Sequence, residues 1–127
     1  MSQEKSFIAY WINKFRVALR GIVVGSWGQA SFAVHLPLAV IVLAAALWLQ
    51  FDLVRICILL LCIGLVLTAE LLNSAIEHLA KAVDSNENEH LRNALDIAAG
   101  AVLLASLLAT IIGTLLFAEP LLLNSSL

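Results

Sequence analysis

Charged residues are scarce in this chain of 127 residues, because Asp, Glu, Lys and Arg together make up only 13% of it. Soluble domains carry roughly 25%. Hydrophobic residues make up 62%, and the mean hydropathy is +1.01. This composition excludes an ordinary soluble domain and predicts a single integral-membrane domain over residues 1–127. The net charge is −2, and no basic patch is interleaved with aromatic residues, so we expect no nucleic-acid partner.

Cysteine is also scarce, and its two positions offer no disulfide framework. Cys57 and Cys62 lie five residues apart in one apolar run, so on a helix they point in different directions. That spacing favours packing over a disulfide or a metal site. The chain also lacks a glycine-rich phosphate loop, because the stretch "GSWG" has neither the spacing nor the lysine of a P-loop.

Long apolar runs are what the sequence has in abundance. A membrane-spanning helix needs about 20 apolar residues, and we expect spans at about 32–51, 54–80 and 94–118. Pro37 falls in the first turn or so of the first span, where a proline does least harm. The polar segment 83–93 separates the second and third spans, and a short C-terminal tail is expected after the third.

The segment before the first span, about residues 5–25, has a helical pattern with two unlike faces. One face carries Phe7, Ile8, Trp11, Phe15, Ala18 and Ile22, and the opposite face carries Asn13, Arg16 and Arg20. This pattern predicts an amphipathic helix that lies on the membrane surface. A soluble amphipathic helix packed on a partner is the alternative, and the neighbouring spans favour the membrane surface.

Basic residues are distributed unevenly about the three predicted spans. Six of the seven lie in the N-terminal segment or around the loop at 81–93, and only Arg55 lies on the other side. Lys and Arg concentrate in cytoplasmic segments of membrane proteins. We therefore expect the N-terminus and the 81–93 loop to be cytoplasmic, and the C-terminus to be extracytoplasmic.

Polar residues appear in the second span near its predicted cytoplasmic end. Glu70, Asn73, Glu77 and Lys81 form one stripe on a helix, and Asp96 opens the third span from the same side. We expect Glu77 and Asp96 to meet near the membrane surface. Carboxylate and amide oxygens are hard ligands that suit Mg²⁺ together with a polyphosphate. Glu70 lies about two turns deeper, where it is a candidate general base.

Two other interpretations of this stripe stay open on the residues alone. Polar residues in spans also hold helices together, and intramembrane carboxylates serve proton or ion conduction as well as catalysis. Two glutamates and one asparagine on a single stripe favour a functional site, and three spans are few for a transporter. We interpret His35 and His78 as packing or interface residues.

The stretch "AELLNSAIEHLAKAVD", followed by "ALDIAAGAVLLAS", closely resembles the small prokaryotic diacylglycerol kinase family, which includes the undecaprenol kinases. The similarity covers about residues 14–118, and "ELLNSAIE" is a specific match. The resemblance implies a homotrimer in the bacterial cytoplasmic (inner) membrane, with a surface helix and three spans in each subunit. It also implies active sites at subunit contacts near the cytoplasmic face.

The resemblance further implies an enzyme that transfers the γ-phosphoryl group of MgATP to a lipid hydroxyl. Glu70 then looks like the general base on that hydroxyl and Glu77 like a Mg²⁺ ligand, with Asn73 beside the site. Asp96 looks like a nucleotide contact. Diacylglycerol, which gives phosphatidic acid, is the expected acceptor. Undecaprenol is the alternative, because an acceptor pocket built from apolar side chains does not separate the two lipids.

The sequence departs from the family pattern at several positions. Gln29 stands where many members carry a glutamate metal ligand, and its carbonyl oxygen can still coordinate a metal and the nucleotide bound to it. Leu95 stands where members have a lysine, and the candidates for the lost phosphate contact are Lys81, Arg20, Lys14 and Arg16. These departures motivate a second hypothesis, a non-catalytic trimeric relative. Glu70 and Glu77 together argue against it.

Overall fold

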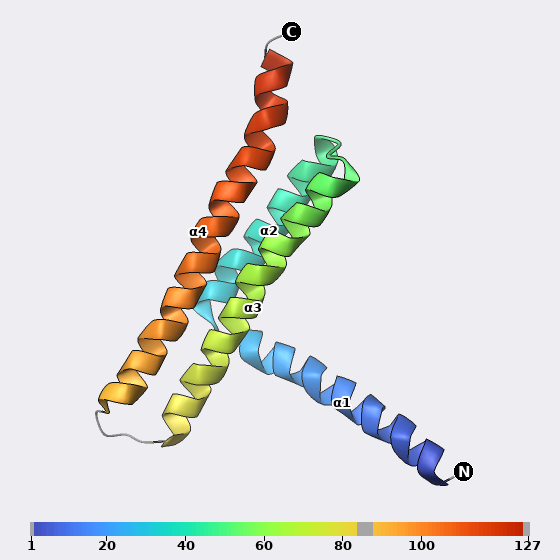
Figure 1. Ribbon diagram of the computed structural model, residues 1–127, viewed down its shortest axis with the longest axis vertical. Helices are drawn as coiled ribbons and strands as arrows, with labels where there is room; N and C mark the ends of the chain where they lie inside the picture. Colours follow the sequence, from blue (N-terminus) through green and yellow to red (C-terminus); the bar gives the residue numbers. More distant parts are fainter. Residues whose placement is uncertain (1, 84–87, 126–127) are drawn as a thin grey trace.

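The computed structural model describes residues 2–83 and 88–125, and this part of the chain is helical with no strand. The four helices are α1 (Ser2–Ser26), α2 (Ala30–Trp48), α3 (Leu53–Val83) and α4 (Glu89–Ser125) (Figure 1). The predicted all-α fold is confirmed. Residues 84–87 of the predicted polar segment lie outside the described residues.

Three of these helices, α2, α3 and α4, are long and apolar enough to cross a membrane, as predicted. At 1.5 Å per residue the 19 residues of α2 reach about 28 Å, close to the ~30 Å hydrocarbon core of a bilayer. The 31 residues of α3 and the 37 residues of α4 exceed that thickness. Because α2 begins at Ala30, Pro37 lies beyond the first turn rather than in it.

The start of α4 differs from the prediction, because the helix begins at Glu89 rather than near 94. Asn88 explains the difference. Its Oδ1 accepts hydrogen bonds from the backbone N–H groups of His90, at 2.9 Å, and Leu91, at 3.3 Å. An asparagine in this place satisfies donors that have no partner inside the helix. The later part of the predicted polar loop is therefore the first turn of α4.

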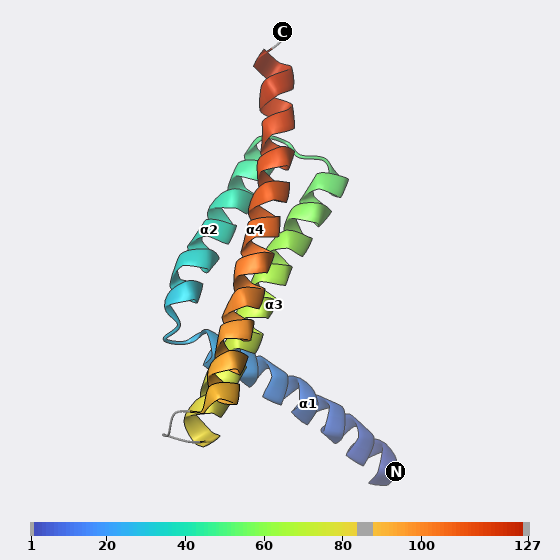
Figure 2. The ribbon, with the colours of Figure 1, turned by 60° about the vertical axis from the view of Figure 1, so that its left-hand side comes forward.

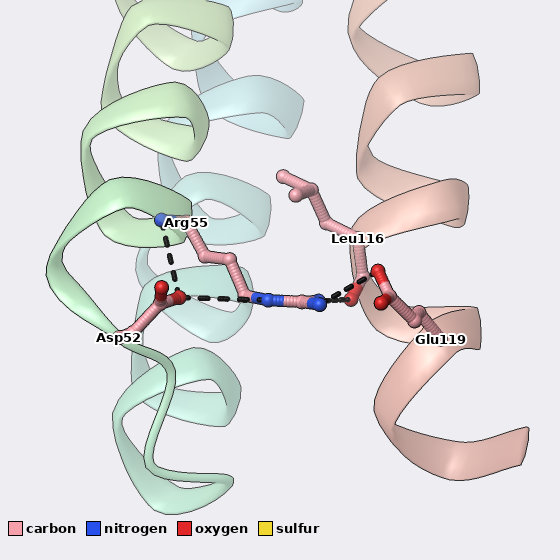
Figure 3. Close-up of polar contacts among 4 residues, drawn as sticks. All are labelled: Asp52, Arg55, Leu116 and Glu119. Atoms are coloured by element: carbon pink, nitrogen blue, oxygen red, sulfur yellow. Dashed lines mark hydrogen bonds and ion pairs between the residues drawn. The ribbon is translucent and has the colours of Figure 1, made fainter. Parts of the chain in front are cut away.

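The predicted C-terminal tail is helical as far as Ser125, since α4 continues through Pro120, and residues 126–127 lie outside the described residues. Proline has no N–H, so the carbonyl of Leu116, four residues earlier, loses its usual helical donor. Nη1 of Arg55 donates to that carbonyl at 2.9 Å, and Nη2 lies 2.6 Å from Glu119 (Figure 3). Nε of the same side chain lies 3.5 Å from Asp52. A neighbouring helix thus supplies the donor that the proline removes.

The turn between α2 and α3 has the hydrogen bonds of a Schellman motif. The N–H of Gln50 donates to Leu47 at 3.1 Å, and the N–H of Phe51 donates to Ala46 at 3.0 Å. Gln50 has a φ of 57°, in the left-handed region that this motif requires after a helix. The turn ends α2 sharply and directs the chain back into α3.

Helices α2, α3 and α4 run alongside one another, and α3 packs against each of the other three helices. Helix α1 leaves this bundle at an angle, at the end where α3 finishes and α4 begins (Figures 1 and 2). The α2–α3 turn and the C-terminus lie at the other end. The N-terminal helix and the start of α4 therefore share one end, as the three-span topology predicts.

No residue of α1 is buried within the chain. Its apolar side chains, such as Phe7 and Phe15, remain about two-thirds exposed, as expected of a helix whose apolar face meets a membrane. Only its C-terminal part approaches α3. A Cβ added at Gly25 would lie 2.8 Å from Cδ2 of Leu71, so the glycine permits the close approach of the two helices.

Candidate active site

The buried face of α3 continues from apolar residues directly into a glutamate. Its members recur every three or four positions, as on one side of a helix. They are Leu59, Cys62, Val66, Glu70 and Ser74. Glu70 is only 3% exposed, although a buried carboxylate is costly unless it has a hydrogen-bonding partner.

His35 of α2 supplies that partner. Its Nδ1 forms a hydrogen bond with Oε1 of Glu70. The His35 side chain is 28% exposed, whereas the Glu70 side chain is 2% exposed. The other oxygen of Glu70, Oε2, is buried and has no hydrogen-bond partner among the described residues. The carboxyl group therefore has one oxygen held by His35 and one buried oxygen without a partner among the described residues.

The interpretation of His35 as a packing or interface residue missed this contact. One signal in the sequence could have found it. His35 is the only titratable residue between Ala30 and Trp48, and an ionisable side chain inside a span needs a partner there. The helix is apolar on every side, so its sequence pattern does not show which face meets α3.

Asn73 and Glu77 lie on α3 toward its C-terminal end and contact each other. Nδ2 of Asn73 donates to Oε1 of Glu77 at 3.0 Å, and both side chains are half-buried. Residues four apart on a helix are neighbours, so this bond follows from the stripe that the sequence shows. It holds the Glu77 carboxylate in a defined orientation. Lys81, one turn further on, is exposed.

Gln29 and Asp96 come from other elements. Gln29 occupies the N-cap position of α2, where it is half-buried and its side chain caps no backbone group. Asp96 is exposed on α4. In the described part of the chain, no three His, Cys, Asp or Glu side chains are placed together so as to hold a metal ion. One chain by itself thus supplies separate candidate ligands rather than a closed metal site.

An apolar cavity of about 410 Å³ lies between α2, α3 and α4, and His35 lines it. The hydroxyls of Thr110 and Thr114 also belong to its wall, but each donates to a carbonyl of α4 itself at 2.7 Å. Most of the remaining wall is apolar, with residues such as Leu59 and Val66. The cavity therefore suits a hydrocarbon group better than a charged one.

A profile of the family described as prokaryotic diacylglycerol kinase matches residues 16–117. A diacylglycerol kinase of Synechocystis sp. (strain ATCC 27184 / PCC 6803 / Kazusa) is 38% identical over 109 residues, which cover 85% of this chain and 62% of that protein. The chain thus spans less than two thirds of this relative's length.

A second relative, an undecaprenol kinase of Bacillus subtilis (strain 168), is 32% identical over 107 residues, which cover 84% of this chain and 87% of that protein. The profile match includes the stripe on α3, Gln29 and Asp96. The chain belongs to the prokaryotic diacylglycerol kinase family.

Proposed function

We propose that this protein is an ATP-dependent membrane lipid kinase that phosphorylates a lipid hydroxyl at the cytoplasmic face of the bacterial inner membrane. One observation carries the proposal. Glu70 is a buried carboxyl group inside a membrane span, with one oxygen bonded to His35 and the other without a partner in the described chain. Family membership identifies the general chemistry, and the unpartnered oxygen of Glu70 is the candidate base for it.

The reaction needs few protein groups. The acceptor hydroxyl gives its proton to Oε2 of Glu70, and the lipid oxygen forms a bond to the γ-phosphorus. The bond between that phosphorus and the β,γ-bridging oxygen breaks, and ADP leaves with the bond's electron pair. Phosphoryl transfer depends mainly on positioning the reactants and on neutralising charge. A short stripe of polar side chains can therefore supply the groups that the reaction needs.

The nucleotide and Mg²⁺ require oxygen ligands, which the stripe can provide. Mg²⁺ takes one or two carboxylates and fills its shell with water and phosphate oxygens. Glu77 is the proposed main ligand, held by Asn73, and the Gln29 carbonyl is a second donor. Asp96 and Lys81 are proposed nucleotide contacts. Mg²⁺ would supply charge neutralisation for the transferred phosphoryl group.

A homotrimer is part of the proposal. Within one chain, the candidate ligands come from α2, α3 and α4 without forming a metal cluster in the described residues. Apolar side chains also stay exposed along all three spans, such as Val40, Leu61 and Leu104. Packing against further copies would complete the site and cover part of this surface. The number three rests on the family resemblance.

Diacylglycerol is the proposed acceptor, with phosphatidic acid as the product, because the Synechocystis relative is the more similar in sequence. Undecaprenol is the second candidate, because the relative that the chain covers more completely is named for that activity. The cavity beside His35 is apolar and would suit the hydrocarbon of either lipid.

The test is direct. Purified protein is given radiolabelled MgATP with diacylglycerol or undecaprenol in mixed micelles, and the lipid phase is examined for labelled product. Phosphatidic acid with the first lipid and little product with the second is the expected result. Product with undecaprenol alone would reassign the acceptor. No product with either lipid, in protein that is folded and trimeric, would favour the non-catalytic relative.

A further inference from the structure

The two oxygens of the Glu70 carboxyl group are in different surroundings. Oε1 meets Nδ1 of His35, and Oε2 is buried without a partner in the described residues. A carboxylate that is to act as a base only accepts hydrogen bonds, so in that form Nδ1 of His35 is the donor to Oε1. A base on a flexible side chain would otherwise be free to turn either oxygen toward a substrate.

We propose that His35 is the positioning residue for the Glu70 base. By holding Oε1 from α2, it fixes the carboxylate of α3 so that Oε2 is the oxygen that receives the acceptor proton. This inference rests on the proposed role of Glu70. It assigns His35 no contact with the nucleotide and no chemical step of its own.

The burial of the pair supports this role. The Glu70 side chain is 2% exposed, and in the described part of the chain the hydrogen bond to its carboxyl group comes from His35. His35 also lines the apolar cavity between the three spans. The apolar wall of this cavity would suit the hydrocarbon chain of a lipid acceptor. A displacement of a reacting group by about 1 Å can cost on the order of 10²-fold in rate.

The alternative is that the bond merely ties α2 to α3. Two substitutions separate the alternatives. His35→Leu fills similar space without a donor. His35→Asn places an amide nitrogen on Cγ, where the histidine has Nδ1, and so restores a donor to Oε1. His90→Leu is the control, because His90 is an exposed histidine in the first turn of α4.

We expect His35→Leu to lower kcat by ~10²-fold while KM for MgATP and for the lipid stays within about twofold. His35→Asn should recover most of that loss, and His90→Leu should behave as wild type. Equal loss in the Asn and Leu variants would overturn the proposal. So would a change confined to KM, or a wild-type kcat in His35→Leu.

A spectroscopic measurement keeps the proposal testable if His35→Leu does not assemble. The ring nitrogens of the three histidines are labelled with ¹⁵N, and the His35 signals are identified by their loss in His35→Asn. Glu70→Gln should move the Nδ1 signal of His35, whereas Glu77→Gln should not. An unchanged signal in Glu70→Gln would overturn the pairing.

Failure of this inference differs from failure of the proposed function. If Glu70→Gln is slow and His35→Leu is as fast as wild type, Glu70 is the base and His35 does not position it. If Glu70→Gln itself retains wild-type turnover, Glu70 is not the base and the positioning role is rejected with it.

Discussion

Nη2 of Arg55 lies 2.6 Å from a carboxylate oxygen of Glu119, so the beginning of α3 is joined to the last turns of α4 (Figure 3). The same guanidinium donates to the carbonyl of Leu116, whose helical donor is missing because Pro120 has no N–H. This contact lies at the end of the bundle opposite to α1. It explains why α4 continues through a proline.

Arg55→Leu should lower the free energy of unfolding by about 1–3 kcal/mol, because the Leu116 carbonyl then loses its replacement donor. Glu119→Gln should cost less than about 1 kcal/mol, since the Glu119 side chain is 61% exposed and exposed ion pairs contribute little. Thermal unfolding in one detergent compares the two variants. Equal losses would mean that the ion pair, rather than the carbonyl, determines the stability of this contact.

Pro120→Ala provides a further check on the same relationship. Alanine restores the backbone N–H, so Leu116 regains a helical donor and depends less on Arg55. The loss caused by Arg55→Leu should therefore be smaller in the Pro120→Ala background. An undiminished loss there would show that the proline does not create the need for Arg55.

Two glycines of α1 should respond differently to alanine. An added Cβ at Gly21 meets nothing within 4 Å, so Gly21→Ala should stabilise the helix by about 1 kcal/mol. At Gly25 the Cβ would lie 2.8 Å from Cδ2 of Leu71, and moving that side chain should offset the gain. Melting temperatures of the two variants test this. If Gly25→Ala stabilises the protein more than Gly21→Ala does, α1 lies further from α3 than in the structure.

The sequence predicts most of the fold, because bilayer thickness and long apolar runs leave few alternatives to three spans. The ends of α4 were harder to predict. A polar segment after Val83 and a proline at 120 both indicate the absence of helix, yet Asn88 caps α4 and Arg55 replaces the donor that Pro120 lacks. The donor from Arg55 is a tertiary contact, which no local pattern contains.

The stripe of Glu70, Asn73 and Glu77 could be read from the sequence because helical periodicity alone places these residues on one side. The partner of Glu70 could not be predicted in this way. Apolar residues lie on every side of α2, so the rotation of α2 about its own axis, which decides which face meets α3, depends on packing. The positions of Gln29 and Asp96 relative to Glu77 could not be predicted from the sequence either. In the proposed assembly they depend on contacts between subunits, which the pattern of one chain does not contain.

Glu77→Gln should weaken Mg²⁺-dependent nucleotide binding by about tenfold or more, because the amide keeps the shape of the side chain and loses its charge. Titration of purified protein with ATP, with and without Mg²⁺, measures the effect by calorimetry. Glu119→Gln is the matched control at the other end of the bundle. Unchanged MgATP affinity in Glu77→Gln would remove Glu77 from the metal site.

Mixed assemblies test whether subunits share sites. Glu70→Gln and Asp96→Asn subunits are each expected to be nearly inactive alone. If Glu70 of one copy works with Asp96 of another, then mixing the two variants before assembly should restore part of the activity, since some contacts combine two intact residues. If the mixture is no more active than either variant alone, Glu70 and Asp96 of one active site belong to the same chain.

The most direct measurement of the central claim is the lipid kinase rate of Glu70→Gln beside its affinity for MgATP. Glutamine keeps the size of the side chain and can still bond to His35, but it cannot accept the proton of a hydroxyl. Positioned base catalysis contributes ~10²–10⁴-fold, so kcat should fall by that order while MgATP binding and the proposed assembly with other copies stay as in wild type. A near-wild-type rate in the folded variant would contradict the account and leave Glu70 as a packing residue between α2 and α3.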